Sequence, residues 1–141
     1  MYQSIQIIGH LGKKPEMRYT PSGQAVTNFS VATTNAYTSA SGEKVKETTW
    51  FRVQVWGNNA ENCNKYLDKG SLVKVEGRMV FDKSTGGPKI FTKSDGTASA
   101  QFEINASNIL FLSKNTASES MTEAAQDLGG QANQDEPDFP F

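Results

Sequence analysis

Five segments of the chain alternate hydrophobic and polar residues with a period of two. Val, Ile, Thr and aromatic residues are frequent in them, and Gly, Pro, Ser and Asn separate them. A period of two in β-branched sequence predicts half-buried β-strands. The predicted strands span residues 4–11, 25–35, 48–57, 71–81 and 100–112. Short strands at these spacings are typical of a small all-β barrel or sandwich.

Residues 58–70, between the third and fourth predicted strands, have a helical pattern instead. Asn58 followed by Glu61 indicates a capping box, and Gly70 is a suitable residue for the helix end. The apolar residues share one helical face: Ala60, Cys63, Tyr66 and Leu67. Three strands, one helix and two strands form the element order of the OB-fold, a five-stranded Greek-key barrel. We therefore expect an all-β OB-fold with one short helix between strands 3 and 4.

Two connections, residues 36–47 and 82–99, are long for a compact domain. Hairpin loops usually have about 2–5 residues, and longer loops are more often functional or disordered. Tyr37 begins the first connection and Phe91 lies inside the second. The connections also carry five lysines: Lys44, Lys46, Lys83, Lys89 and Lys93. Each lysine alone is explained as a solvated surface charge, but lysines beside aromatic residues are candidate nucleic-acid contacts.

The third predicted strand has an unusual exposed face. On one side of the strand, Phe51, Val53 and Val55 are expected to pack into the core. The opposite side, by the period of two, presents Trp50, Arg52, Gln54 and Trp56. Aromatic rings on a basic surface suit single-stranded nucleic acid, because bases stack on the rings while Lys and Arg neutralise phosphates. A single strand tryptophan is more often a core or interface residue, but two on one face flanking an arginine favour binding.

The net charge conceals two opposed regions. The 141 residues carry a formal charge of −1. Residues 1–113 hold 13 basic and 9 acidic residues, a net of +4, whereas residues 114–141 hold 1 basic and 6 acidic residues, a net of −5. This asymmetry suggests a nucleic-acid partner for the body and an interaction role for the tail. We expect a folded domain at 1–113, a disordered linker at 114–134 and an acidic tip at 135–141, because the tail has almost no large apolar residues.

Several classes of protein are excluded by what the sequence lacks. No apolar run approaches the roughly 20 residues of a membrane span, and no secretory signal is visible. With one cysteine, Cys63, and one histidine, His10, neither an intrachain disulfide nor a metal site of several Cys or His residues is expected. No phosphate-binding loop or acid–base cluster is visible. We expect a protein that is not an enzyme and has no cofactor or metal.

With these features the sequence resembles bacterial-type single-stranded DNA-binding proteins, a family of homotetrameric OB-fold proteins. The matching stretches are IIGHLGKKPEMRYTPSGQAVTNFSVAT (7–33), TTWFRVQVWG (48–57), YLDKGSLVKVEGRM (66–79), FEINASNILFL (102–112) and DFPF (138–141). The resemblance implies sequence-independent protection of single-stranded DNA in replication, recombination and repair. It also implies a homotetramer in the bacterial cytoplasm, on the nucleoid, with a chromosomal, plasmid or phage origin left open.

The resemblance also assigns roles to individual residues. Trp50 matches a stacking tryptophan, Trp56 an aromatic that is usually Phe, and Tyr37 an aromatic that is usually Trp. Arg52 and Lys69 match positions near the DNA path. Phe91 is the nearest substitute for a DNA-contacting tryptophan of the second long loop, which is a departure from the family. The tip that would dock genome-maintenance proteins comprises Asp135, Glu136, Asp138, Phe139, Pro140 and Phe141.

Two other interpretations remain open at this point. An OB-fold module for RNA binding or translation would share the aromatic and basic surface, but it would not need the acidic, Phe-ended tail. An OB-fold protein-interaction module would use the tryptophan face as an interface. Competition between poly(dT) and poly(U) distinguishes the first of these, and quenching of tryptophan fluorescence by an oligonucleotide distinguishes the second.

Overall fold

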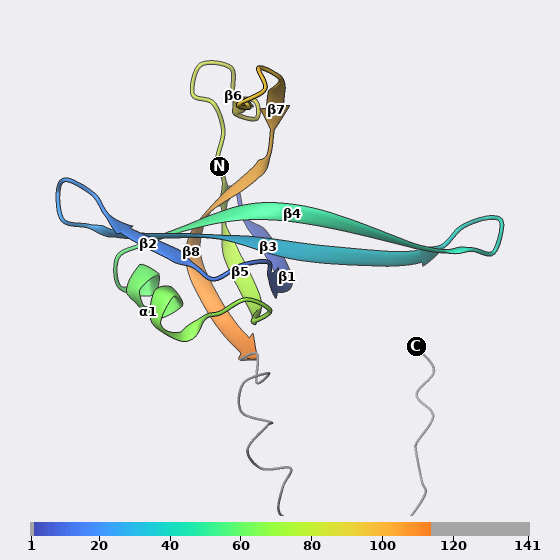
Figure 1. The fold of residues 1–141 in the computed structure, drawn as a ribbon, viewed down its shortest axis with the longest axis horizontal. Coiled ribbons are helices and arrows are strands. Elements are labelled where there is room, and N and C mark those ends of the chain that lie inside the picture. The colour runs from blue at the N-terminus through green and yellow to red at the C-terminus, as the bar shows by residue number, and fades with distance from the viewer. Residues whose placement is uncertain (1, 114–141) are drawn as a thin grey trace, which may run out of the picture.

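The computed structural model describes residues 2–113, which form a β-barrel with two projecting hairpins and one helix (Figure 1). The predicted linker 114–134 and tip 135–141 lie outside the described residues. The elements are β1 (Ile5–Leu11), β2 (Glu16–Tyr19), β3 (Ala25–Thr38), β4 (Lys44–Trp56), α1 (Asn58–Tyr66), β5 (Leu72–Met79), β6 (Ile90–Thr92), β7 (Ala98–Ala100) and β8 (Phe102–Ser113). The five predicted strands correspond to β1, β3, β4, β5 and β8.

The barrel is closed by pairing between its first and last strands. The strand order is β1-β5-β8-β4-β3, and β1 returns to β3 through His10 opposite Ala32 and Leu11 opposite Val31. β4 and β8 run parallel, and the other pairs are antiparallel. With α1 between β4 and β5, this arrangement confirms the predicted OB-fold.

The core follows the alternation read from the sequence. Ala25, Thr27, Phe29 and Val31 of β3 point inward, and so do Val53 and Val55 of β4 and Val73 and Val75 of β5. The helix covers one end of the barrel with Ala60 and Cys63, and Leu67 follows it into the core. The buried hydroxyl of Thr27 donates to the Ala60 carbonyl at 2.7 Å, so its burial leaves no unsatisfied hydrogen-bond donor. Burial raises the pKa of Cys63 to about 12, as expected for a packing thiol.

The helix is shorter than predicted, and the prediction of a capping box at Asn58 and Glu61 is wrong. Gly57, with φ 66°, is the N-cap, and no side chain caps the helix. The N–H of Gly57 donates to the Ala25 carbonyl. Gly57 is the one residue between the end of β4 and the start of the helix, and it has no side chain that could cap the helix. At the other end, Leu67 adopts an extended conformation that places its side chain in the core. Gly70 lies beyond the helix, in a turn with φ 82°.

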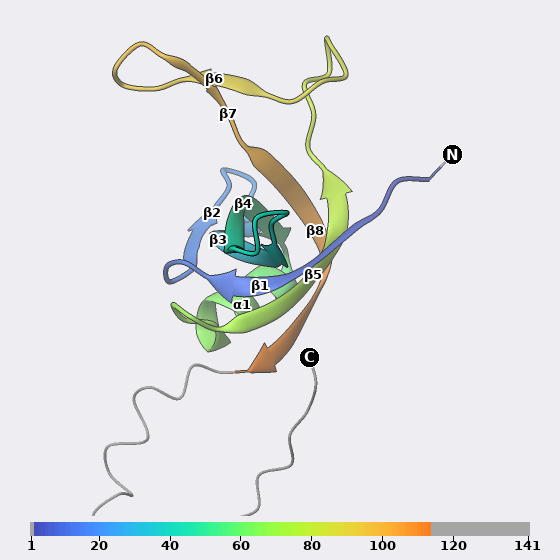
Figure 2. The same cartoon turned by 90° about the vertical axis from the view of Figure 1, so that its right-hand side faces the viewer.

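Both long connections are largely hairpins rather than loops. β3 and β4 continue side by side to Thr38 and Lys44, beyond the barrel, and only residues 39–43 turn (Figure 1). The second connection contains the small β6–β7 hairpin, which projects away from the barrel (Figure 2). The alternation did not predict these extensions, because strands exposed on both faces carry no hydrophobic period. It also missed β2, which has only four residues, of which Met17 packs against the core. Within residues 2–113, no helix has the length and hydrophobicity needed to cross a membrane.

Candidate nucleic-acid interface

The exposed face predicted for β4 exists and continues onto β3. Val53 and Val55 are at most 1% exposed, whereas Trp50 is 53% exposed. Across the ladder, Trp50 lies opposite Ala32, and Arg52 opposite Ser30. These partners are small, so the larger side chains of β4 stand above their neighbours. We call the outward residues of β3 and β4 from Val26 to Ala32 and from Trp50 to Trp56 the tryptophan face.

A glycine of the neighbouring segment supports the Trp50 ring. A Cβ atom added to Gly12 would lie 2.5 Å from Cζ3 and 2.8 Å from Cη2 of Trp50. The ring therefore occupies the space that any other residue at position 12 would fill. The N–H of Gly12 donates to the Ser30 carbonyl at 3.0 Å, which holds this segment against β3. One side of the indole is thereby supported while much of the ring remains exposed, as a stacking platform requires.

Trp56 stands at the other end of the tryptophan face and differs from Trp50. It is half-buried, opposite Val26, and Val26 is in turn opposite Arg18 of β2. The two tryptophans are six residue steps apart along β4, which corresponds to about 20 Å. The face therefore carries two separate indole rings with Arg52 between them in the strand.

Acidic groups moderate the positive charge of this surface. Glu103 of β8 lies opposite Arg52, and Glu16 of β2 lies opposite Asn28. Glu16 accepts a hydrogen bond from Lys13 at 3.0 Å, which is the main reason that its pKa is lowered. Because both partners are exposed, this ion pair stabilises the fold little. The face is polar and mixed in charge rather than uniformly cationic.

The β3–β4 arm places the residues of the first long connection on two sides. The register is continuous from Trp56 to Lys44, so Lys44 and Lys46 share the side of Trp50. Tyr37, opposite Val45, lies on the other side of the ribbon, where its hydroxyl donates to Glu47 at 3.1 Å. The structure thus brings the two lysines onto one side with Trp50 and places Tyr37 on the opposite side.

Lys69 lies in the loop between α1 and β5. The N–H of Gly70 donates to the Leu11 carbonyl at 2.8 Å, and the N–H of Leu11 donates to the Ser71 carbonyl at 3.0 Å. These bonds bind the loop to the end of β1, next to Gly12. The backbone of Lys69 is therefore fixed near the supported side of Trp50.

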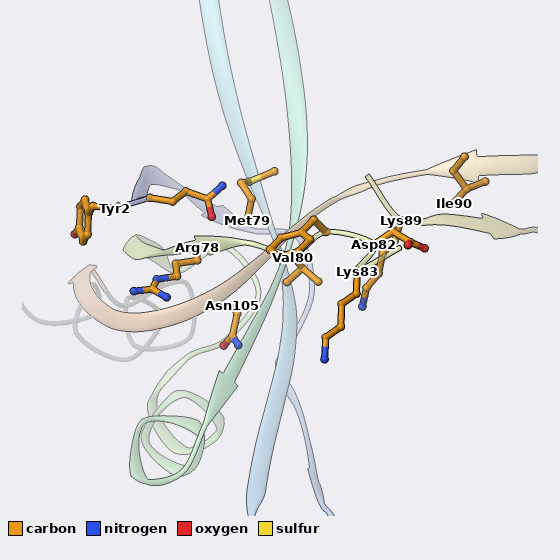
Figure 3. A pocket seen from close by; sticks show the side chains of 11 residues that line it. Tyr2, Arg78, Met79, Val80, Asp82, Lys83, Lys89, Ile90 and Asn105 are labelled. Atoms are coloured by element: carbon orange, nitrogen blue, oxygen red, sulfur yellow. The ribbon is translucent and has the colours of Figure 1, made fainter. Parts of the chain in front are cut away.

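The second long connection borders a groove of about 810 Å³ at the base of the β6–β7 hairpin (Figure 3). Tyr2 lies at one end of the groove, and Lys83 and Lys89 lie at the other. Phe91, opposite Ser99, is 40% exposed and does not line the groove. Lys93 closes the hairpin turn, with its N–H donating to the Thr97 carbonyl.

The groove and the tryptophan face are joined across β8. Gln54 lies opposite Asn105, and Asn105 lies opposite Arg78, which lines the groove with Phe81. Asp82 at its rim accepts hydrogen bonds from the side chain and backbone of Ser84, which lower its pKa and hold its carboxylate in the turn. Sequence analysis did not single out Arg78, although the outward alternation of Lys74 and Glu76 would have found it.

Within residues 2–113, no group of three or more His, Cys, Asp or Glu side chains is arranged to hold a metal ion.

A family model described as the "Single-strand binding protein family" matches residues 2–112. The chain belongs to the single-strand binding protein family. Members of this family are DNA-binding proteins rather than enzymes, which confirms the prediction that the chain is not an enzyme.

Individual relatives agree with this membership. Single-stranded DNA-binding protein 1 of Chlorobaculum tepidum is 33% identical over 155 aligned positions, covering 97% of this chain and 96% of the relative. The single-stranded DNA-binding protein of Neisseria meningitidis is 38% identical over 108 positions, covering 77% of this chain and 58% of the relative. The crystal structure of a deletion mutant of the single-stranded DNA binding protein from Thermus aquaticus matches with a TM-score of 0.62 and 29% identity, covering 82% of this chain and 52% of the other.

The contact between Gly12 and Trp50 leads to a testable prediction about this family member. Gly12→Ala should displace the indole, because the ring is the movable partner, and should weaken binding of single-stranded DNA by about 1 kcal/mol, the lower end of a stacking contribution. The urea midpoint should change little. Fluorescence titration with poly(dT) measures the affinity. An affinity equal to that of wild type would show that the position of the Trp50 ring against Gly12 does not affect DNA binding.

Proposed function

We propose that the chain binds single-stranded DNA without sequence specificity and protects it during replication, recombination and repair. The observation that carries this proposal is the exposed Trp50 ring, supported by Gly12 and two residues from Arg52 on the same side of β4. Bases would stack on Trp50 and Trp56 while Arg52, Lys44 and Lys46 neutralise phosphates. The names of the relatives support this function, and the bacterial cytoplasm is the compartment that we propose for it.

The groove beside the β6–β7 hairpin extends the proposed path. Arg78 and Asn105 connect it in register to Gln54, so one strand of DNA could cross β8 from the tryptophan face. Lys83 and Lys89 would then contact phosphates in the groove, with Lys93 and Phe91 on the adjacent hairpin. Such phosphate contacts release counterions, so affinity should fall steeply as salt rises.

Titration of tryptophan fluorescence with poly(dT) at several salt concentrations tests the proposed function. The chain has two tryptophans, and both lie on the tryptophan face, so quenching reports DNA at that face alone. We expect quenching and a strong salt dependence. Poly(U) as a competitor separates the RNA-binding alternative. Unquenched fluorescence at low salt would overturn the proposal and favour a protein interface at this face.

We propose further that the chain is a homotetramer. Residues Ile5–Ile8 of β1 pair only with β5 within the described range, so their other edge is open. Ile8, Leu110 and Leu112 lie near this region and are 56%, 51% and 44% exposed. An open strand edge with exposed apolar side chains favours self-association. Light scattering coupled to size exclusion should give about four times the monomer mass, and a monomer at micromolar concentration would contradict this.

The C-terminal tip is proposed to recruit replication, recombination and repair proteins. It comprises Asp135, Glu136, Asp138 and the residues Phe139, Pro140 and Phe141, which lie outside the described residues. Deleting residues 139–141 should leave poly(dT) affinity within about twofold of wild type, since the deletion removes none of the residues proposed to contact DNA. Recovery of partner proteins from a bacterial lysate should be lost. Recovery of the same proteins without the tip would refute the recruiting role.

A further inference from the structure

His10 lies on the outer side of the barrel in the same row as Trp50. In the register, His10 is opposite Ala32, and Ala32 is opposite Trp50. Leu11, the next residue, is 2% exposed and points into the core, so His10 points outward, and it is exposed.

The Trp50 ring extends toward the strand that carries His10. Its Cζ3 and Cη2 atoms lie against Gly12, two residues after His10 and on the same side of the chain. Among His10, Gly12 and Ala32, which lie on this side of the sheet, Gly12 and Ala32 have no polar side-chain atom. His10 is therefore the side chain in this group that can bind the backbone of a nucleotide whose base stacks on Trp50.

We propose that His10 is a further contact of the single-stranded DNA, and that its protonated imidazole binds a phosphate beside the Trp50 platform. This inference rests on the proposed function. An imidazolium carries two N–H donors and a positive charge, which suits a phosphate oxygen. The neutral ring lacks the charge, so the contact strengthens when the ring is protonated.

The surroundings of His10 make its contribution measurable. Ionisable groups on the adjacent strands and loops are Lys13, Arg52, Asp68, Lys69 and Lys74. Among side-chain types, histidine is the one that ordinarily changes its charge in the interval from about pH 5.5 to 8. Leu72, opposite His10 on β5, carries no charge. Because His10 is the one histidine in the sequence, a change of side-chain charge at this site in that interval comes from this residue.

The direction of the pH effect follows from linkage. Phosphate binding raises the pKa of an imidazole, because it favours the charged form. The added affinity is therefore fully present below the pKa of the free protein and is lost as the pH rises through the pKa of the complex. Bound DNA should in turn retain the proton on His10 to a higher pH.

The experiment measures poly(dT) affinity from tryptophan quenching between pH 5.5 and 8 for three full-length proteins: wild type, His10→Gln and His10→Lys. Thymine carries no group that titrates in this interval, and the α-amino group is common to all three proteins. Wild type should bind about two- to fivefold more tightly at pH 5.5 than at pH 8, relative to His10→Gln, as expected for one exposed ion pair. The slope of log K against log salt should steepen by about 0.7 for each protonated contact.

The two variants separate the possible results. His10→Lys should bind at every pH as tightly as wild type does at pH 5.5, and His10→Gln as wild type does at pH 8. If wild type and His10→Gln have the same pH profile and the same salt slope, the His10 inference is wrong while the proposed function stands. If none of the three proteins quenches with poly(dT) at low salt, the proposed function itself fails. Proton NMR of the single imidazole, with and without DNA, should show its pKa raised in the complex.

Discussion

Replacement of Trp50 by alanine is expected to weaken binding of poly(dT) by about 1–3 kcal/mol, a factor of roughly 5 to 150. The ring is 53% exposed and is supported by Gly12, so its free surface is available to a base. The folded state should lose little stability, because the ring contributes to no part of the buried core. A loss of affinity without a loss of stability would identify a binding residue.

The measurement uses quenching of the remaining tryptophan, Trp56, and a filter or mobility assay that does not depend on fluorescence. Tyr19→Ala is a matched control. Tyr19 is an aromatic strand residue with 62% exposure, and it lies opposite Ala25, on the other side of the sheet from Trp56 and Arg18. It should bind poly(dT) as wild type does. Equal losses in the two variants would mean that general aromatic exposure, rather than the tryptophan face, decides affinity.

Substitution of Gly9 by alanine is expected to lower the free energy of unfolding by about 3 kcal/mol or more. A Cβ at this position would lie 2.2 Å from the Ala32 carbonyl oxygen and 2.8 Å from Cγ1 of Val31. Gly9 precedes the two pairs, His10 with Ala32 and Leu11 with Val31, that close the barrel. Because the obstructing atom belongs to the backbone, relief requires β1 and β3 to separate at the closure.

Urea denaturation followed by circular dichroism measures this effect as a lower midpoint. Gly87→Ala is the matched control, since its added Cβ would meet only the Thr85 hydroxyl at 3.5 Å, an ordinary contact. That variant should unfold with the midpoint of wild type. A Gly9→Ala midpoint equal to that of the control would show that the barrel closes without the close approach of the two strands.

Much of the fold could be predicted because the buried strands carry a strong period of two. Phe29 and Val31, or Val53 and Val55, alternate with polar residues wherever one side faces the core. The same rule failed at Thr38 and Lys44, where the arm has solvent on both sides and no alternation records the strand. The predicted end of the helix was wrong for a related reason. Leu67 leaves the helix and packs into the core, and the local sequence does not reveal where that core lies.

The tryptophan face was predictable within a strand but not between strands. Alternation along β4 placed Trp50, Arg52 and Trp56 together before any pairing was known. That Gly12 supports the Trp50 ring depends on a segment about forty residues away, brought in by barrel closure. Tyr37 illustrates the opposite case, because an unbroken register puts it on the other side of the arm.

The opposition between a basic body and an acidic tail, the sequential order of the main strands and the helix, and the outward tryptophans follow from the sequence alone, because charge and alternation are local properties of the chain. Three features were decided only by tertiary structure: the support under Trp50, the row that includes His10, and the path across β8 through Asn105 to Arg78. Each of them joins residues that are distant in the chain. Such contacts are created by closure of the barrel and by the register between strands, which no single segment encodes.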